Sequence, residues 1–228
     1  MTNASLTHIL FILDRSGSME SIRADTIGGF NAFLAGQRET AGRCTMTLVQ
    51  FDHEYEERFC GLPIEQVRSL DTASFIPRGS TALLDAIGRA LIQEGERLSA
   101  TPEEQRPGLV ICAILTDGEE NASTEFSAAK IRQMLSHQRE VYGWQVIFLG
   151  ANQDAFAVAD SLGIQRTHAS SFSADAIGVG TSFKSTSDLA SRMRKSTAMG
   201  RSAAEEAFSE EERDAMINTP PPPPRRRR

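Results

Sequence analysis

Oxygen-bearing side chains occur along this sequence in a pattern that could hold a metal ion. Asp14, Ser16 and Ser18 form the motif D-x-S-x-S directly after the apolar residues ILFIL. Thr81 and Asp117 lie far along the chain, each beside a segment with an apolar pattern. Two carboxylates and three hydroxyls, without Cys or His, are hard donors that favour Mg²⁺ or Mn²⁺ over Zn²⁺ or copper. We therefore expect a site for a hard divalent cation.

The charge of these donors limits what the bound ion could do. Two carboxylates neutralise a divalent cation without excess, and the hydroxyls add no charge. The ion would stay electrophilic, and an open position of its octahedral shell would favour an external carboxylate over water. A site with more carboxylates lacks this property because it over-neutralises its metal.

Short apolar runs alternate with longer amphipathic segments, and this alternation indicates how the donors are positioned. The predicted strands cover residues 8–13, 45–51, 109–115 and 145–149. The predicted helices cover residues 21–37, 81–98, 127–138 and 154–162. Such alternation is typical of a mainly parallel sheet with helices on both faces. We expect a doubly wound, Rossmann-like three-layer α/β sandwich, in which residues 45–51 and 57–60 form one antiparallel edge pair.

The candidate donors fall at one edge of this sheet. Asp14 and Asp117 each follow a predicted strand, and ligands of open parallel sheets bind beyond the carboxyl ends of the strands. Thr81 begins the predicted helix at 81–98, where it or Ser80 is also expected to act as the N-cap. All five candidate donors could therefore converge.

Three segments of the chain together resemble von Willebrand factor type A domains that carry a metal-ion-dependent adhesion site. The matching segments are DRSGS at 14–18, GST at 79–81 and LTDG at 115–118, and the resemblance extends over roughly residues 5–170. The order of strands and helices agrees with it. The combination is more specific than a lone D-x-S-x-S motif.

The resemblance implies a role for each donor. Ser16 and Ser18 would ligate the ion directly, whereas Thr81, Asp14 and Asp117 would do so directly or through water. A Glu or Asp of a protein partner would complete the shell. Loop shifts at Thr81 and Asp117 would gate this capture.

Further side chains at the same edge are expected to face a partner: Arg15, Gly79, Ser80, Glu119, Asn152 and Asp154. Plainer roles stay open for several of them. A solvated loop is favoured for Glu119 and its neighbour Glu120, and capping of the helix at 154–162 is favoured for Asn152 and Asp154.

The chain has 228 residues, with 24 Lys and Arg against 30 Asp and Glu, and a net charge of −6. Four of the cations are Arg225–228, so the rest of the chain carries 20 cations against 30 acids. A body that acidic is a poor binder of phosphate backbones, and we do not expect nucleic acid as its partner. It favours cations or basic surfaces.

Length and composition indicate one main domain with an appendage. We expect a metal-binding domain over residues 1–170 and a helical extension over 171–218 that could pack on it. Segments 187–195 and 203–217 have helical patterns there, and Ser209 with Glu212 has the spacing of a capping box. Residues 219–228, with PPPPP and RRRR, should form a disordered tail.

The cellular setting is expected to be cytoplasmic. Cys44, Cys60 and Cys112 form neither a CxxC pair nor a zinc set. The first residues lack the pattern of a signal peptide, and no apolar window is long enough to span a membrane. The chain looks most like intracellular bacterial or phage-type members of the family, which often work with AAA+ ATPases or with stress and defence assemblies.

Signals for catalysis fail on inspection. The segment GVGTSFKS at 178–185 lacks the Gly that precedes Lys in a P-loop, and no histidine pair has HExxH spacing. The leading expectation is therefore a non-enzymatic, Mg²⁺-dependent protein-binding module. Two alternatives stay open: a Mg²⁺- or Mn²⁺-dependent phosphoesterase-like hydrolase, and a scaffold subunit with a structural metal that docks through residues 203–228.

Overall fold

The computed structural model describes residues 2–151 and 154–217. Six strands form one sheet in the order β3-β2-β1-β4-β5-β6. They are β1 (Asn3–Asp14), β2 (Arg43–Phe51), β3 (Tyr55–Pro63), β4 (Pro107–Thr116), β5 (Gln145–Ala151) and β6 (Ala169–Phe172). Neighbouring strands are parallel except for the edge strand β3, which pairs antiparallel with β2. The predicted sheet type and its antiparallel edge are confirmed.

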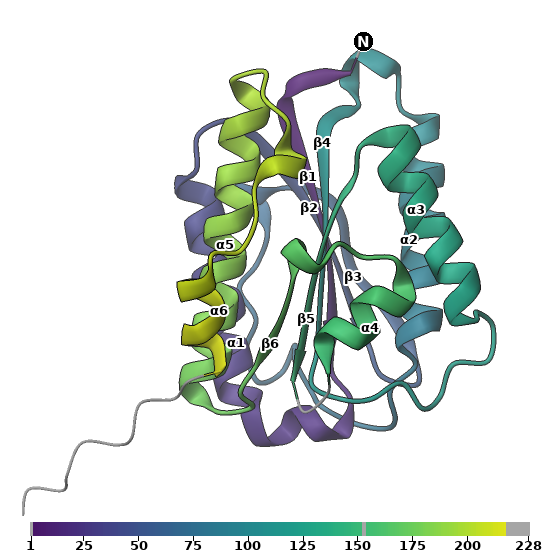
Figure 1. The fold of residues 1–228 in the computed structure, drawn as a ribbon, viewed down its shortest axis with the longest axis vertical. Helices are drawn as coiled ribbons and strands as arrows, with labels where there is room; N and C mark the ends of the chain where they lie inside the picture. The colour runs from purple at the N-terminus through teal and green to yellow at the C-terminus, as the bar shows by residue number, and fades with distance from the viewer. Residues whose placement is uncertain (1, 152–153, 218–228) are drawn as a thin grey trace, which may run out of the picture.

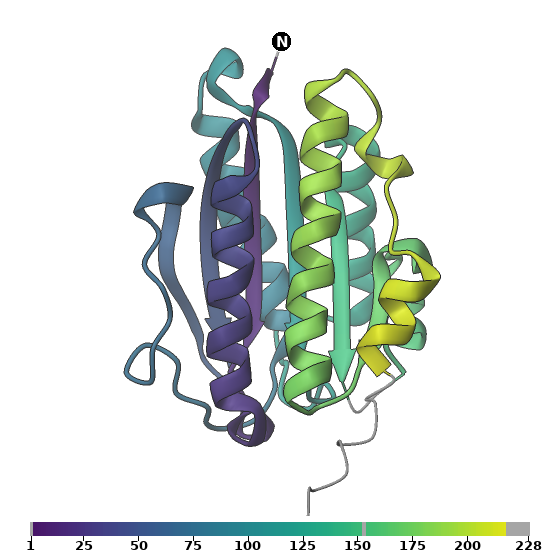
Figure 2. The same ribbon diagram turned by 90° about the vertical axis from the view of Figure 1, so that its left-hand side faces the viewer.

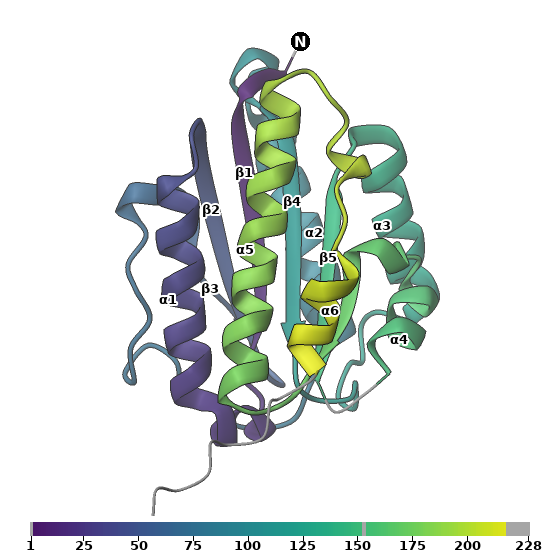
Figure 3. The ribbon, with the colours of Figure 1, turned by 60° about the vertical axis from the view of Figure 1, so that its left-hand side comes forward.

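Helices cover both faces of this sheet, as Figure 1 shows. They are α1 (Arg23–Glu39), α2 (Leu83–Ala100), α3 (Ala128–Tyr142), α4 (Ala155–Leu162), α5 (Ala176–Ala198) and α6 (Glu210–Ile217). One layer holds α1, α5 and α6, and the other holds α2, α3 and α4 (Figures 1 and 3). The three-layer sandwich is therefore confirmed. No helix in the described part of the chain is long and apolar enough to cross a membrane.

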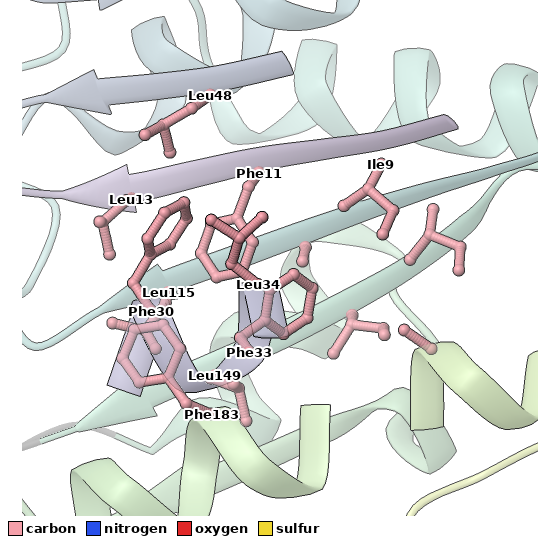
Figure 4. Close-up of a cluster of buried hydrophobic side chains, with 14 of the residues drawn as sticks. Ile9, Phe11, Leu13, Phe30, Phe33, Leu34, Leu48, Leu115, Leu149 and Phe183 are labelled. Carbon is pink, nitrogen blue, oxygen red and sulfur yellow. The ribbon is translucent and has the colours of Figure 1, made fainter. Parts of the chain in front are cut away.

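Strand β1 builds both cores because its side chains alternate between the two faces. Ile9, Phe11 and Leu13 point into the core under α1 and α5, while Leu10 and Ile12 point into the core under α2 and α3. The ring of Phe11 packs edge-on against Phe30 and Phe33 of α1, with centroids 5.6 and 5.1 Å apart, and stacks on Phe183 of α5 at 6.0 Å (Figure 4). Residues after position 170 thus contribute to the central core.

Helices α1 and α5 lie side by side on the sheet (Figure 2). A Cβ added at Gly29 would come within 2.2 Å of the Phe183 ring, so only glycine permits this approach. Arg194 of α5 is 3% exposed, and its guanidinium donates to the carbonyl oxygens of Gln37, Thr40 and Gly42 where α1 ends. The expected boundary after residue 170 falls within β6.

The segments after residue 170 differ from their predicted bounds. Helix α5 begins at Ala176 rather than 187, and the expected helix at 203–217 is a short 3-10 turn, Ala203–Glu205, followed by α6. The capping box is present, because the Ser209 and Glu212 amides donate to each other's side chains. The expected tail at 219–228 lies outside the described residues.

A buried polar cluster lies between the sheet and α2. Glu94 is 2% exposed; it pairs with Arg97 and lies 3.1 Å from the imidazole Nε2 of His8. Thr47 donates to the second Glu94 oxygen at 3.2 Å. Burial would raise the pKa of Glu94, but the contacts with His8 and Arg97 outweigh it and lower that pKa to about 2. This carboxylate is compensated within the protein.

Candidate metal centre

Three neighbouring strands bring carboxylates to one edge of the sheet. Asp14 is the last residue of β1, Asp52 follows β2 and Asp117 follows β4. Strand β1 lies between β2 and β4 in register, so these three residues come together where the strands end. The carboxyl ends of β1, β2 and β4 lie at the lower end of the sheet in Figure 1. The sequence predicted this convergence for Asp14 and Asp117 but did not include Asp52.

Asp14 is fully buried, and both of its carboxylate oxygens accept hydrogen bonds. The Ser16 amide donates to Oδ1 at 2.6 Å, and the Thr116 hydroxyl donates to Oδ2 at 2.6 Å. Burial raises the pKa of Asp14 to about 6 against these hydrogen bonds, and the nearby charge of Asp117 adds to the rise. Burial also raises the pKa of Asp117. A cation placed here would offset that unfavourable charge.

The hydroxyls of the motif lie at distances that suit a metal shell. Ser16 Oγ and Ser18 Oγ are 3.0 Å apart, and Ser18 Oγ donates to Asp117 Oδ1 at 2.5 Å. Adjacent ligand oxygens around an octahedral ion with bonds of about 2.1 Å lie about 3.0 Å apart. The spacing of the two serines therefore fits Mg²⁺ or a similar ion.

Gly118 shows that a third hydroxyl joins them. A Cβ added at Gly118 would lie 2.9 Å from Thr81 Oγ1, 3.3 Å from Ser18 Oγ and 3.5 Å from Ser16 Oγ. The three hydroxyls thus surround one point beside Asp117, and a side chain at Gly118 would intrude on them. Hydroxyl and carboxylate oxygens are the donors that hard divalent cations prefer.

The hydroxyl of Thr81 is not used to cap a helix. Helix α2 begins at Leu83, Ala82 occupies the N-cap position, and no side chain caps there from that position. The expected N-cap role of Ser80 or Thr81 is therefore wrong. Glu120 accepts instead from the Leu84 amide at 2.9 Å in the first turn of α2.

The loop after Asp117 is bound firmly to the loop that carries Thr81. The Thr81 amide donates to the Asn121 side chain at 2.9 Å, and the Thr81 carbonyl accepts from the amides of Asn121 and Ala122. The Glu120 carboxylate also accepts from the Ala122 and Ser123 amides. The solvated role expected for Glu120 is therefore wrong, and the two loops form one hydrogen-bonded unit.

Asp52 ties the same loops together from the other side. Its fully buried carboxylate accepts from Arg15 Nε and from Arg78 Nε, both at 2.9 Å, and its carbonyl accepts from the Ala82 amide. Arg15 lies within the D-x-S-x-S motif, and Arg78 precedes Gly79. The Gly17 amide also donates to the Gly79 carbonyl at 3.1 Å. The serine loop and the threonine loop are thus fixed relative to each other.

The residues expected to face a partner lie in different surroundings. Gly79, Ser80 and Glu119 are exposed at this edge. Arg15 is only 5% exposed, and its guanidinium pairs with Asp52 and Glu56. Asp154 is exposed and caps α4 through the Phe156 and Ala157 amides, as expected. Asn152 lies outside the described residues.

Asp52 was missed because its signal is weak in the sequence. It stands in FDHEYEER at 51–58, where an acidic hairpin turn explains every carboxylate. The one available sign is its place directly after a predicted strand, which it shares with Asp14 and Asp117.

Comparisons with known proteins identify the fold. No model of a protein family matches the chain, and no curated protein matches it. Among solved structures, proximal thread matrix protein 1 from the mussel byssus has a TM-score of 0.56 at 16% identity, covering 84% of this chain and 48% of that one. A second structure of that protein, with a zinc-occupied metal-ion-dependent adhesion site motif, has a TM-score of 0.54 at 17% identity, covering 84% and 47%.

An archaeal protein gives a similar result. The ArnB paralog VWA2 from Sulfolobus acidocaldarius has a TM-score of 0.50 at 15% identity, covering 83% of this chain and 46% of that one. The chain spans about half the length of these solved structures. Sheet order, the antiparallel edge and these neighbours agree, and the chain therefore has the fold of von Willebrand factor type A domains.

Proposed function

We propose that this chain is a non-enzymatic module that binds a protein partner through Mg²⁺ or Mn²⁺. The observation that carries the proposal is the convergence of the Ser16, Ser18 and Thr81 hydroxyls beside Asp117 at the carboxyl edge of the sheet. The ion, when bound, supplies an electrophilic position that accepts a carboxylate oxygen of the partner. The zinc in the metal site of the mussel protein supports a divalent cation in this fold.

The residues of this chain have distinct tasks in the proposed site. Ser16 and Ser18 hold the cation directly, and Thr81 and Asp117 hold it directly or through water. Asp14 stands behind them, with both oxygens already accepting hydrogen bonds that fix its orientation. The hydrogen bonds between Asn121 and Thr81 keep the threonine loop against the loop of Asp117. Any gating shift therefore moves both loops together.

The partner presents an Asp or Glu side chain at a surface that can approach this edge. Gly79, Ser80 and Glu119 are exposed there and would contact it. The resemblance to intracellular bacterial and phage-type members favours a cytoplasmic setting, with an AAA+ ATPase or a stress or defence assembly as the partner.

Calorimetric titration tests the metal site. The wild-type chain should bind Mg²⁺ and Mn²⁺, and Asp14→Ala should lose that binding. Asp188→Ala is the matched control, because Asp188 lies on α5 and pairs with Lys184 away from the site. Equal Mg²⁺ binding by wild type and Asp14→Ala would show that the proposed metal site is wrong.

Affinity capture from host lysate tests the mode of partner binding. Wild type should retain a partner in Mg²⁺ and lose it in EDTA, and Asp117→Ala should fail to retain it in either buffer. A partner retained equally in all conditions would contradict carboxylate capture and favour docking through the C-terminal segment. Metal-stimulated hydrolysis of a phosphoester would favour the hydrolase alternative.

A further inference from the structure

A cavity opens beside the amino ends of β1, β4 and β5, at the opposite end of the sheet from the candidate metal centre. It has a volume of about 590 Å³ and lies between α2 and α3. Thr2, Pro107 and Trp144 line it from the amino ends of β1, β4 and β5. Known small-molecule sites have volumes of about 300–1,000 Å³, so the cavity is large enough for one such ligand.

Apolar side chains form much of the wall of this cavity. Leu91 and Leu98 come from α2, Val110 comes from β4, and Trp144 directly precedes β5; all four are otherwise buried. Ile92 and Tyr142 also line it, yet they remain 44% and 63% exposed. Large exposed apolar side chains beside a cavity indicate a surface that a ligand covers.

The charged side chains at the cavity are both cations. Arg106 and Lys130 line it beside the imidazole of His137, and no Asp or Glu does so among the described residues. Arg106 is held in place because Nε and Nη2 donate to the Thr101 and Ser99 carbonyls at 2.7 and 2.8 Å. The excess of positive charge at the cavity contrasts with the net charge of −6 of the whole chain. The cavity therefore complements an anionic group attached to an apolar body.

We propose that this cavity binds an amphiphilic carboxylate of the size of a medium-chain free fatty acid. The alkyl chain would cover Ile92 and Leu98, and the carboxylate would lie toward Lys130 in the first turn of α3. The four arginines at 225–228 have the wrong charge to occupy the cavity. One small molecule fits the volume better than a helix of a partner protein, whose diameter with side chains is about 10 Å.

The single tryptophan of the chain makes a direct test possible. Trp144 lines the cavity, so its fluorescence reports on occupancy without a label. Sodium decanoate, titrated into the full-length chain below its micellar concentration, should shift this emission saturably. Decanol and decyltrimethylammonium, which have the same alkyl chain, should bind about tenfold more weakly, because they lack the negative charge.

Two pairs of variants locate the binding. Gly95→Leu fills the cavity, and its Cβ would lie 3.7 Å from Gln138 Nε2, which is an ordinary contact. The control Gly28→Leu places the same side chain on α1, where an added Cβ meets nothing within 4 Å. Lys130→Glu reverses one charge at the cavity, and Lys195→Glu does so on α5. Thermal melting checks that all four variants are folded.

The expected result is loss of decanoate binding in Gly95→Leu and about tenfold weakening in Lys130→Glu, with both controls unchanged. Equal binding of decanoate and decyltrimethylammonium would overturn the proposal, as would undiminished binding by folded Gly95→Leu. No response to carboxylates from six to fourteen carbons would also overturn it. Binding of an acidic amphipathic peptide alone would assign the cavity to a protein partner instead.

Discussion

Buried carboxylates lie in two regions of this molecule and are compensated differently. Glu94 under α2 has Arg97 and His8 beside it, and its pKa falls to about 2. Asp14 at the sheet edge is equally buried but accepts from neutral amide and hydroxyl donors, and burial raises its pKa to about 6. The fold supplies its own cation to the first carboxylate. At the second it leaves negative charge that an external cation can neutralise.

The comparison separates structural carboxylates from candidate ligands. Asp52 lies at the same edge as Asp14, yet it has two arginines and belongs with Glu94 in this respect. Position at the carboxyl edge of the sheet is therefore not sufficient to mark a metal ligand. What distinguishes a structural carboxylate from a candidate ligand is whether its hydrogen-bond donors are cationic or neutral.

The largest effect is expected from Glu94→Gln. The change removes one partner of a buried charged cluster and should lower the free energy of unfolding by about 3 kcal/mol. Urea unfolding measures it, with the exposed Glu96→Gln on the same helix as control. Mg²⁺ affinity should stay unchanged. A loss of Mg²⁺ affinity in folded Glu94→Gln would mean that the two regions are not independent.

Asp14→Asn should instead increase the stability of the metal-free protein. Burial raises the pKa of Asp14 to about 6, so its ionised form is unfavourable in the folded protein. Removing that charge should raise the free energy of unfolding in EDTA at pH 7.5 by about 2 kcal/mol. The same variant should lose stabilisation by Mg²⁺. A metal-free Asp14→Asn that is less stable than wild type at pH 7.5 would contradict the contrast drawn above.

The pH dependence of unfolding in EDTA checks whether Asp14→Asn stabilises the metal-free protein. The raised pKa of Asp14 means that its favourable contribution is present below about pH 4 and is lost as pH rises through about 6. The stability of Asp14→Asn relative to wild type should therefore increase between about pH 4 and pH 6. Glu94 has the reverse dependence, because its contribution persists above about pH 4.5 and is lost as pH falls toward about 2.

Asp52→Asn should weaken Mg²⁺ binding about tenfold without removing it. The carboxylate does not belong to the proposed donor set but holds Arg15 and Arg78 on the two donor loops. Calorimetry measures the change at a temperature where the variant is folded. Glu54→Gln is the control, since Glu54 is exposed and its carboxylate pairs with Arg78 Nη2 and His53 on the surface. Complete loss of Mg²⁺ binding would place Asp52 among the ligands.

The smallest effect is expected from Asn121→Ala. Its side chain accepts from the Thr81 amide and keeps the threonine loop in place, while the backbone bonds between the loops remain. Mg²⁺ affinity should fall about threefold. Ser99→Ala, away from the site, should leave the affinity unchanged. An effect as large as that of Asp52→Asn would show that Asn121 carries most of the link between the loops.

The fold was largely predictable because its central strands are buried apolar runs. Beyond about residue 170 the pattern was weaker. Strand β6 has only four residues, ASSF, and α5 contains Gly178, Gly180 and several serines that blur its apolar pattern. Its packing depends on Gly29 and Phe183, which are far apart in the sequence. Such a contact depends on tertiary packing and leaves no local periodic signal.

Of the candidate site, the convergence of the proposed donors was predictable from the sequence, and the residues that support them were not. D-x-S-x-S, Thr81 and Asp117 form a recognisable set of residue types. The roles of Asp52, Glu120 and Asn121 depend on hydrogen bonds to backbone amides and to distant arginines, which any acidic or amide side chain in a loop could form. Asp117 and Glu120 are both acids in one loop, and only their surroundings distinguish them.

The two edges of the sheet limit how another chain could associate with it. Strand β3 carries Glu56, Glu57 and Arg58 in succession, and its pairing with β2 shifts register twice. At the other edge, the Phe208 amide donates to the Thr167 carbonyl and the Arg213 side chain donates to the Ala169 carbonyl. Charge and irregular pairing discourage strand addition at the first edge, and the segment before and within α6 covers the second. Fibre-like growth through β-augmentation is thereby disfavoured, and recognition is left to side chains at the ends of the sheet.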